Sequence, residues 1–122
     1  MAKYIFPVYT NPTSPQQEAE FNRWYDEHHL ADVIDVPGFV AATRYRLATT
    51  QFANNPAPLT HRYLALYEIE TDDLPGTMRA LLERIPSMVP SEAIDLAHMN
   101  APVLEQIGGR LLAEDVRRAR RR

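Results

Sequence analysis

The segment that most constrains the fold is residues 61–70, His-Arg-Tyr-Leu-Ala-Leu-Tyr-Glu-Ile-Glu. Its content of aromatic and aliphatic residues is typical of a β-strand. Apolar side chains occupy both sides of this strand: Tyr63, Tyr67 and Ile69 on one side, Leu64 and Leu66 on the other. Because both sides are apolar, we expect both faces of the sheet that contains this strand to be covered.

Prolines and glycines divide the rest of the chain into shorter segments. The predicted strands are residues 3–9, 38–47 and 101–107, and the predicted helices are residues 15–33 and 73–85. Pro7 within the first strand favours an edge position or a bulge. The order β-α-β-β-α-β predicts an α+β, ferredoxin-like fold with a four-stranded antiparallel sheet and both helices on one face.

The size of the chain, 122 residues, is typical of one compact domain. We therefore expect a single domain over residues 1–122, in which residues 110–122 form a basic C-terminal tail or helix. The sheet face without helices also looks apolar, which predicts a homodimer whose sheets face each other or close into a shared barrel. Residues 48–60 are a polar connector, either a lid over a pocket or a surface loop.

Local sequence signals predict where both helices begin. Ser14, Pro15 and Gln17 fit a capping box with proline at the first helical position. Thr71-Asp72-Asp73 is predicted to cap the second helix. The expected buried stripe of this helix, at helical spacing, is Leu74, Met78, Leu81, Leu82 and Ile85.

Composition and charge exclude several classes of function. The chain has no cysteine, which excludes a disulfide, a thiol nucleophile and a thiolate metal site. It has no apolar run long enough to cross a membrane and no signal peptide, so we expect a cytoplasmic protein. Five arginines in residues 117–122 leave the rest of the chain acidic, with eight Lys and Arg against 16 Asp and Glu. Such a tail favours neutralisation of its own surface or of a partner subunit over nucleic-acid binding.

The densest group of chemically active side chains lies on the first predicted helix, in residues 21–29. Regular helical spacing places His29 beside Tyr25 and His28 beside Trp24. The two histidines diverge by about 100° around the helix, so they cannot hold one metal ion together, and no metal site is expected. One of them is a candidate general acid or base beside an aromatic wall that suits a small apolar ligand. Either is also compatible with a purely structural role.

Strand positions supply further candidates for substrate binding. Arg44 and Arg46 share one side of the second strand, and His61, Tyr63 and Tyr67 share one side of the third. Arg44 is predicted either to hold an anionic group of a substrate or to pair with Glu68 or Glu70 across the strands. Asp32 lies at helical spacing from His28 and could orient an imidazole.

Residues 20–47 resemble the EthD-like branch of the dimeric α+β barrel superfamily. The resemblance rests on an aromatic residue, a histidine four positions later, and a Pro-Gly pair before a strand, here Tyr25, His29 and Pro37-Gly38. Leu30-Ala31 stands where many members have Gly-Pro, and His28 is an additional histidine. The resemblance implies a homodimer with a pocket between the sheet and the helices of each subunit. Members include cofactor-free monooxygenases, polyketide cyclases, decarboxylases and muconolactone isomerase, and some bind haem.

These observations predict a small enzyme that needs no cofactor and acts on an aromatic or polyketide-like substrate, with or without a carboxylate. His29 is the predicted proton-transfer residue, with Tyr25 as its catalytic partner. The predicted substrate-binding residues are His28, Trp24, Arg44, Tyr63 and His61. The reaction expected is of the lyase, decarboxylase or cyclase type, and a cofactor-free monooxygenase is the alternative. A third hypothesis is a dimeric protein that binds a hydrophobic ligand or haem without catalysis.

Overall fold

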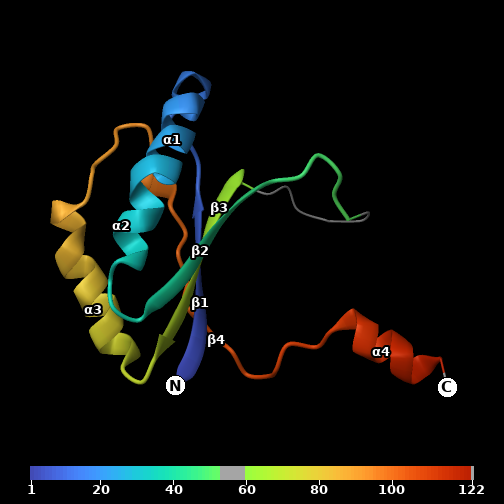
Figure 1. Cartoon of the computed structure of the whole chain (residues 1–122). Helices are drawn as coiled ribbons and strands as arrows, with labels where there is room; N and C mark the ends of the chain where they lie inside the picture. The colour runs from blue at the N-terminus through green and yellow to red at the C-terminus, as the bar shows by residue number, and fades with distance from the viewer. Residues whose placement is uncertain (53–59, 122) are drawn as a thin grey trace.

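The computed structural model describes residues 1–52 and 60–121. Its four strands are β1 (Ala2–Thr10), β2 (Phe39–Arg46), β3 (Tyr63–Thr71) and β4 (Leu104–Glu105). They form one antiparallel sheet in the order β2-β3-β1-β4, and its main helices lie against one face (Figure 1). This is the predicted α+β, ferredoxin-like arrangement. The predicted connector at residues 48–60 lies mostly outside the described residues, so the choice between a lid and a surface loop stays open.

Pro7 lies in the middle of a central strand, because β1 is paired with β3 on one side and β4 on the other. The expectation of an edge strand was therefore wrong. The odd-numbered main-chain groups of β1 point toward β4, since Tyr9 exchanges hydrogen bonds with Asn100 and Lys3 accepts one from Gln106. Pro7 falls between these contacts and has no N–H to donate. The pairing on this side of β1 is interrupted at Pro7, so the missing N–H breaks no ladder hydrogen bond. As a result, the fourth strand is two residues long rather than the predicted seven.

The first helical segment runs from Pro15 to Ile34 as one continuous rod with a change of pitch. A 3₁₀ turn precedes α1 (Glu18–Trp24), a π turn spans Tyr25–His29, and α2 (Leu30–Ile34) completes it. Pro15 takes the first helical position as predicted, but the side chain of Ser14 makes no capping bond, so the capping box does not form. The backbone carbonyl of Ser14 accepts from the N–H of Gln17 instead.

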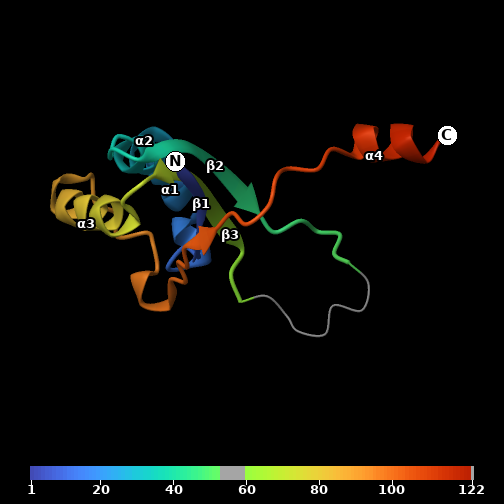
Figure 2. The same ribbon diagram turned by 90° about the horizontal axis from the view of Figure 1, so that it is seen from below.

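The second helix, α3 (Leu74–Arg84), begins where its cap predicts. The Asp73 carboxylate accepts a hydrogen bond from the backbone N–H of Gly76 at 3.0 Å. The predicted stripe is only partly correct. Leu81 is buried, but Leu82 is 67% exposed and Ile85 is 50% exposed. The buried side of α3 is narrower than expected because the helix packs at the margin of the sheet (Figure 2).

The core lies between the sheet and the helices. Aromatic and aliphatic side chains from the strands, the helices and the segments that connect them form it: Phe6, Val8, Phe21, Trp24, Tyr25, Val33, Val36, Phe39, Tyr63, Ala65, Tyr67, Ile69, Leu81, Ala93 and Ile94. The opposite face of the sheet carries Tyr9, Leu64, Leu66 and Tyr45 and is not covered by any described segment. This open face matches the predicted apolar face without helices.

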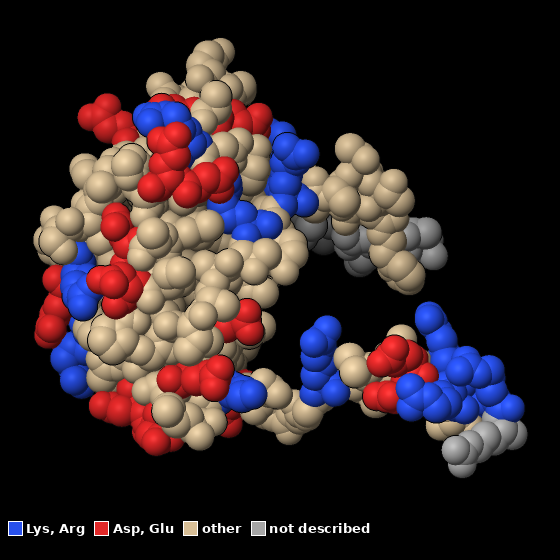
Figure 3. Space-filling view, viewed as in Figure 1, with Lys and Arg blue, Asp and Glu red and all other residues tan. Residues whose placement is uncertain are grey.

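The C-terminal arm, residues 106–121, leaves the body after β4 and ends in α4 (Ala113–Arg120) (Figure 1). It extends on the side of the open sheet face, away from the helices (Figure 2). Ile107 within it is 95% exposed. Basic side chains gather at its end (Figure 3). Within the described ranges, no helix has the length and apolar character that crossing a bilayer requires.

Candidate functional site

A cavity of about 410 Å³ lies between the helix-covered face of the sheet and the helices. Five parts of the chain form its wall: β1, β3, the helical segment from Trp24 to Val33, Leu81 of α3, and residues 85–101. The lining residues are Phe6, Val8, Trp24, Tyr25, His29, Val33, Tyr67, Leu81, Ile85, Pro86, Met88, Val89, Pro90, Ser91, Ile94, Leu96, Met99 and Ala101. A volume of this size and an apolar wall are typical of a small-molecule site.

The π turn decides which histidine faces the cavity. The ring of His29 stacks on Trp24, with centroids 4.3 Å apart and planes at 18°, although the two residues are five positions apart. His29 also meets the edge of Tyr25 at 5.3 Å. In a π turn, residues five apart share a face, which regular α-helical spacing would assign to residues four apart. His29 is therefore the histidine that stacks on Trp24, and His28 is not among the residues that line the cavity.

His29 is an uncharged imidazole at neutral pH. Burial lowers the pKa of His29 to about 4, and the nearby Asp32 carboxylate opposes this only partly. Its Nδ1 atom is buried and has no hydrogen-bond partner among the described residues. Asp32 therefore does not orient the ring through Nδ1, and its carboxylate accepts from the backbone N–H of Val89 at 3.1 Å. His29 thus brings an unpaired ring nitrogen to the wall of the cavity.

Two tyrosines of the wall stay protonated. Burial raises the pKa of Tyr25 and of Tyr67, so both remain neutral phenols over the physiological range. The Tyr25 hydroxyl has a long contact with the hydroxyl of Thr10 at 3.4 Å. The Tyr67 hydroxyl has no partner among the described residues. Tyr67 was predicted to share a side of its strand with His61 and Tyr63 but was not among the predicted site residues. The available signal was its position on the same side as Tyr63, four residues further along the strand.

Residues 85–101 are the part of the wall that sequence reasoning missed. The indole N–H of Trp24 donates to the backbone carbonyl of Val89 at 2.8 Å, which fixes this segment over the helix. The apolar residues between Pro86 and Pro90, Met88 and Val89, were the available signal. They have no helical or strand periodicity, so the sequence does not indicate which way they face.

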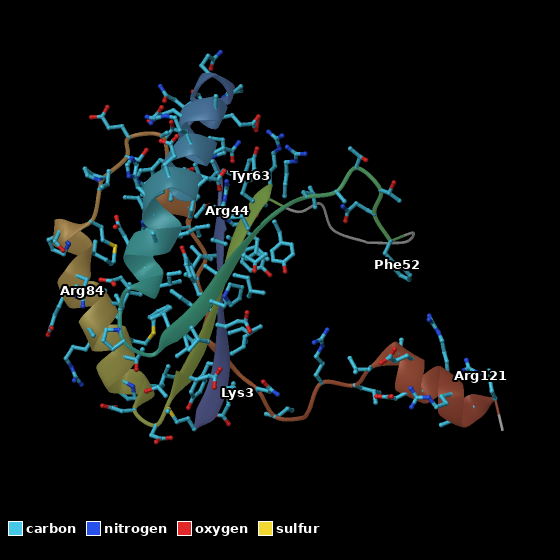
Figure 4. The ribbon with its side chains drawn as sticks, viewed as in Figure 1. Lys3, Arg44, Phe52, Tyr63, Arg84 and Arg121 are labelled. Carbon is cyan, nitrogen blue, oxygen red and sulfur yellow. The ribbon has the colours of Figure 1, made fainter. Side chains whose placement is uncertain are left out.

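Arg44 and Tyr63 are not among the residues that line the cavity, and they lie in a polar cluster along α1 and the start of the π turn (Figure 4). Arg44 pairs with Asp26 at 3.1 Å and donates to the Asn22 side chain at 2.8 Å, with its guanidinium over the Tyr25 ring. The Tyr63 hydroxyl donates to Glu18 at 2.9 Å. The predicted cross-strand pairing of Arg44 was wrong, because Ala65 is its partner on β3. With its charge already paired, Arg44 is not placed to hold a ligand in the cavity.

His61 is also outside the cavity. It precedes β3 and lies in a separate hollow on the open face of the sheet, beside Tyr9. One ring nitrogen contacts the hydroxyl of Thr60 and the other the backbone carbonyl of His98. Of the seven predicted site residues, the structure brings together Trp24, Tyr25 and His29. In the part of the chain that the structure describes, no cluster of three or more His, Asp or Glu could hold a metal ion.

No family model matches this chain, and no curated protein matches it. Solved structures do share its fold. An EthD family protein from Bacillus halodurans has 13% identity, a TM-score of 0.56, and covers 88% of this chain and 100% of its own. A "putative monooxygenase" from Shewanella loihica has 12% identity, a TM-score of 0.52, and covers 89% and 99%. A protein of unknown function from Nitrosomonas europaea has 16% identity, a TM-score of 0.50, and covers 93% and 97%.

Proposed function

Because this chain has the fold of the EthD-like proteins of the α+β barrel superfamily, we propose that it is a small enzyme acting on an aromatic or polyketide-like substrate in the cavity. The reaction needs no cofactor and relies on acid–base chemistry by His29. The observation that carries the proposal is a half-buried, uncharged imidazole on the wall of an apolar cavity, whose buried Nδ1 atom has no partner among the described residues.

Proton transfer is the chemistry that this arrangement favours. A neutral imidazole accepts a proton from an acidic C–H group next to a substrate carbonyl, and the electron pair left behind delocalises onto the carbonyl oxygen. The apolar wall keeps water away from the resulting enolate. In an isomerisation the proton then returns at another carbon. In a cyclisation the enolate carbon bonds to a second carbonyl carbon of the substrate, and the alkoxide formed from that carbonyl takes the proton from the imidazolium. Trp24 and Tyr25 hold the imidazole plane between them.

A cofactor-free monooxygenase is the alternative that shares this first step. The same enolate can pass electrons to molecular oxygen, giving a substrate peroxide that takes its proton back from His29. The apolar cavity supports this alternative, since dioxygen is apolar and the enolate would be protected from water. Oxygen consumption during turnover separates the two reactions: a lyase or cyclase uses none, and a monooxygenase uses one molecule for each substrate.

The test of acid–base catalysis is hydrogen–deuterium exchange at acidic carbons. The protein is incubated in D₂O with a panel of bicyclic and tricyclic aromatic ketones, and exchange is followed by NMR. We expect accelerated exchange that His29→Phe abolishes and that His28→Phe, outside the cavity, leaves intact. Full exchange by a folded His29→Phe protein would remove His29 from the mechanism. A ligand that binds and is recovered with no exchange would favour the binding-protein hypothesis.

Haem fits this cavity poorly as an alternative ligand. His29, Met88 and Met99 in the lining carry atoms that can ligate iron, but the wall residues that the structure describes include no Lys or Arg to meet the two propionates. A Soret shift on addition of haemin would contradict this.

We also propose that two copies associate through the open face of the sheet. Tyr45, Leu64 and Tyr9 form one row across three strands, and Leu66 lies in the next row. An apolar face of this kind is a typical interface, and a two-fold axis would cover both copies with the same patch. The C-terminal arm extends on this side of the sheet, where it would contact the second copy (Figure 2).

A further inference from the structure

The polar atoms of the cavity wall are nearly all satisfied within the protein. The Trp24 N–H donates to Val89, the Ser91 hydroxyl accepts from Ala93, and the Tyr25 hydroxyl contacts Thr10. Two side-chain atoms remain without a partner among the described residues: Nδ1 of His29 and the hydroxyl oxygen of Tyr67.

Leaving such groups unpaired costs free energy, so their presence needs a cause. Tyr67 is 1% exposed, which excludes bulk water as the routine partner of its hydroxyl. Tyr67 and His29 both belong to the wall of the cavity. Unpartnered polar groups on an otherwise apolar wall are the usual means by which a site orients a ligand.

The charge of the wall restricts the ligand further. Among its lining residues there is no Asp, Glu, Lys or Arg. Arg44, the arginine among the predicted site residues, is already paired with Asp26. The imidazole of His29 is uncharged and Tyr67 is a neutral phenol. A carboxylate placed here would lose its hydration without gaining a cation, which is strongly unfavourable.

We propose that Tyr67 is a specificity-determining residue, and that the ligand is an uncharged ring compound whose hydroxyl or carbonyl oxygen bonds to the Tyr67 hydroxyl and His29 Nδ1. This rests on the proposed function, since it concerns the same cavity. It also narrows that function: the substrate carries no carboxylate in the cavity. Cyclisation or isomerisation of a phenol or ketone fits better than decarboxylation of an aromatic acid.

The test compares three probes of nearly equal ring size: 1-naphthol, naphthalene and 1-naphthoate. Binding to the protein is measured at pH 7 by calorimetry, together with the thermal shift that each probe causes. We expect 1-naphthol to bind about tenfold more tightly than naphthalene, the typical gain from a neutral hydrogen bond to an otherwise unpaired group. We expect 1-naphthoate to bind more weakly than either.

Tyr67→Phe is the matched variant, and Tyr45→Phe on the open face is its control. Tyr67→Phe keeps the ring and removes only an unpaired hydroxyl, so the free protein should melt at the same or a higher temperature. It should lose the preference for 1-naphthol over naphthalene, whereas Tyr45→Phe should keep it. The higher or equal melting temperature separates this role from a structural one.

The outcomes distinguish this inference from the proposed function. Equal binding of 1-naphthoate and 1-naphthol, or an unchanged preference in Tyr67→Phe, would overturn the inference and leave the apolar cavity as a binding site. Absence of binding by all three probes would overturn both, because a cavity of about 410 Å³ has room for two fused rings.

Discussion

At the scale of single residues, His29 owes its chemistry to its surroundings. The stacking on Trp24 and the edge of Tyr25 remove water from the ring, and the pKa of His29 falls to about 4. Asp32 is the carboxylate that opposes this fall, and its oxygen is already occupied by the Val89 N–H. The site therefore provides a weak base that is always available, rather than one that is half protonated at neutral pH.

This lowered pKa predicts a specific dependence of stability on pH. The unfolded chain takes up a proton at His29 near pH 6.5, whereas the folded chain does so only near pH 4. The free energy of unfolding therefore carries the full contribution of the neutral His29 above pH 6.5. It decreases as the pH falls from 6.5 toward 4, because the unfolded chain then binds a proton that the folded chain does not. Between pH 7 and pH 4.5 the loss should be about 2 kcal/mol. Urea unfolding at both pH values should show a smaller loss in His29→Phe, while His28→Phe should behave as the wild type.

Gly38 is a second residue whose role depends on its surroundings. Its φ is +101°, and a Cβ built on it would lie 2.9 Å from Cγ2 of Thr77. Both the backbone conformation and the close approach of α3 require glycine. Gly38→Ala should lower the unfolding free energy by about 2 kcal/mol. Gly108→Ala, with no atom within 4 Å of the added Cβ, is the control that should change it little.

At the scale of elements, the N-terminal ends of the two helical segments differ in whether the predicted capping side chain forms its hydrogen bond. Asp73 caps α3 with its carboxylate, but the side chain of Ser14 makes no cap bond at the first helical segment. Both positions carry residues that favour N-caps, so the sequence could not separate them. The difference arises because Pro15 starts a 3₁₀ turn. In this turn the N–H of Gln17, which the Ser14 side chain would cap, already donates to the backbone carbonyl of Ser14.

The two caps give an element-scale prediction with its own control. Asp73→Ala should lower the unfolding free energy by about 1 kcal/mol, because the Gly76 N–H loses its partner. Ser14→Ala should change it by less than about 0.5 kcal/mol, since no side-chain bond is lost. Chemical denaturation of the two variants side by side measures this. A larger loss in Ser14→Ala than in Asp73→Ala would contradict the assignment.

At the scale of the whole molecule, the sheet has two apolar faces, of which one is covered by helices and the other is open. The helix-covered face encloses the core and the cavity. The open face, with Leu64, Leu66 and Tyr9, has no cover among the described segments. Basic side chains gather at the end of the C-terminal arm, whereas the visible face of the body carries both acidic and basic groups (Figure 3). Both features are compatible with association of two copies.

Association through the open face can be tested by sedimentation. The wild type should sediment as a dimer, and Leu66→Glu should sediment as a monomer, because a charge at the centre of the apolar face cannot be buried against its own copy. Leu82→Glu, on the exposed side of α3, should leave the dimer intact. A monomeric wild type, or a dimeric Leu66→Glu protein, would refute the proposed interface.

The sequence by itself determined the order of the elements, the cap of α3 and which residues of β3 share a side, because these follow from local backbone preferences and a two-residue strand period. It also identified Trp24, Tyr25 and His29 as candidates. Only the tertiary structure decided that a π turn aims His29 at Trp24, that Arg44 binds Asp26, and that Tyr67 and residues 85–101 complete the wall. These features depend on contacts between segments far apart in the chain. The free energy of such packing cannot be predicted from a short stretch of sequence, whereas local propensity can.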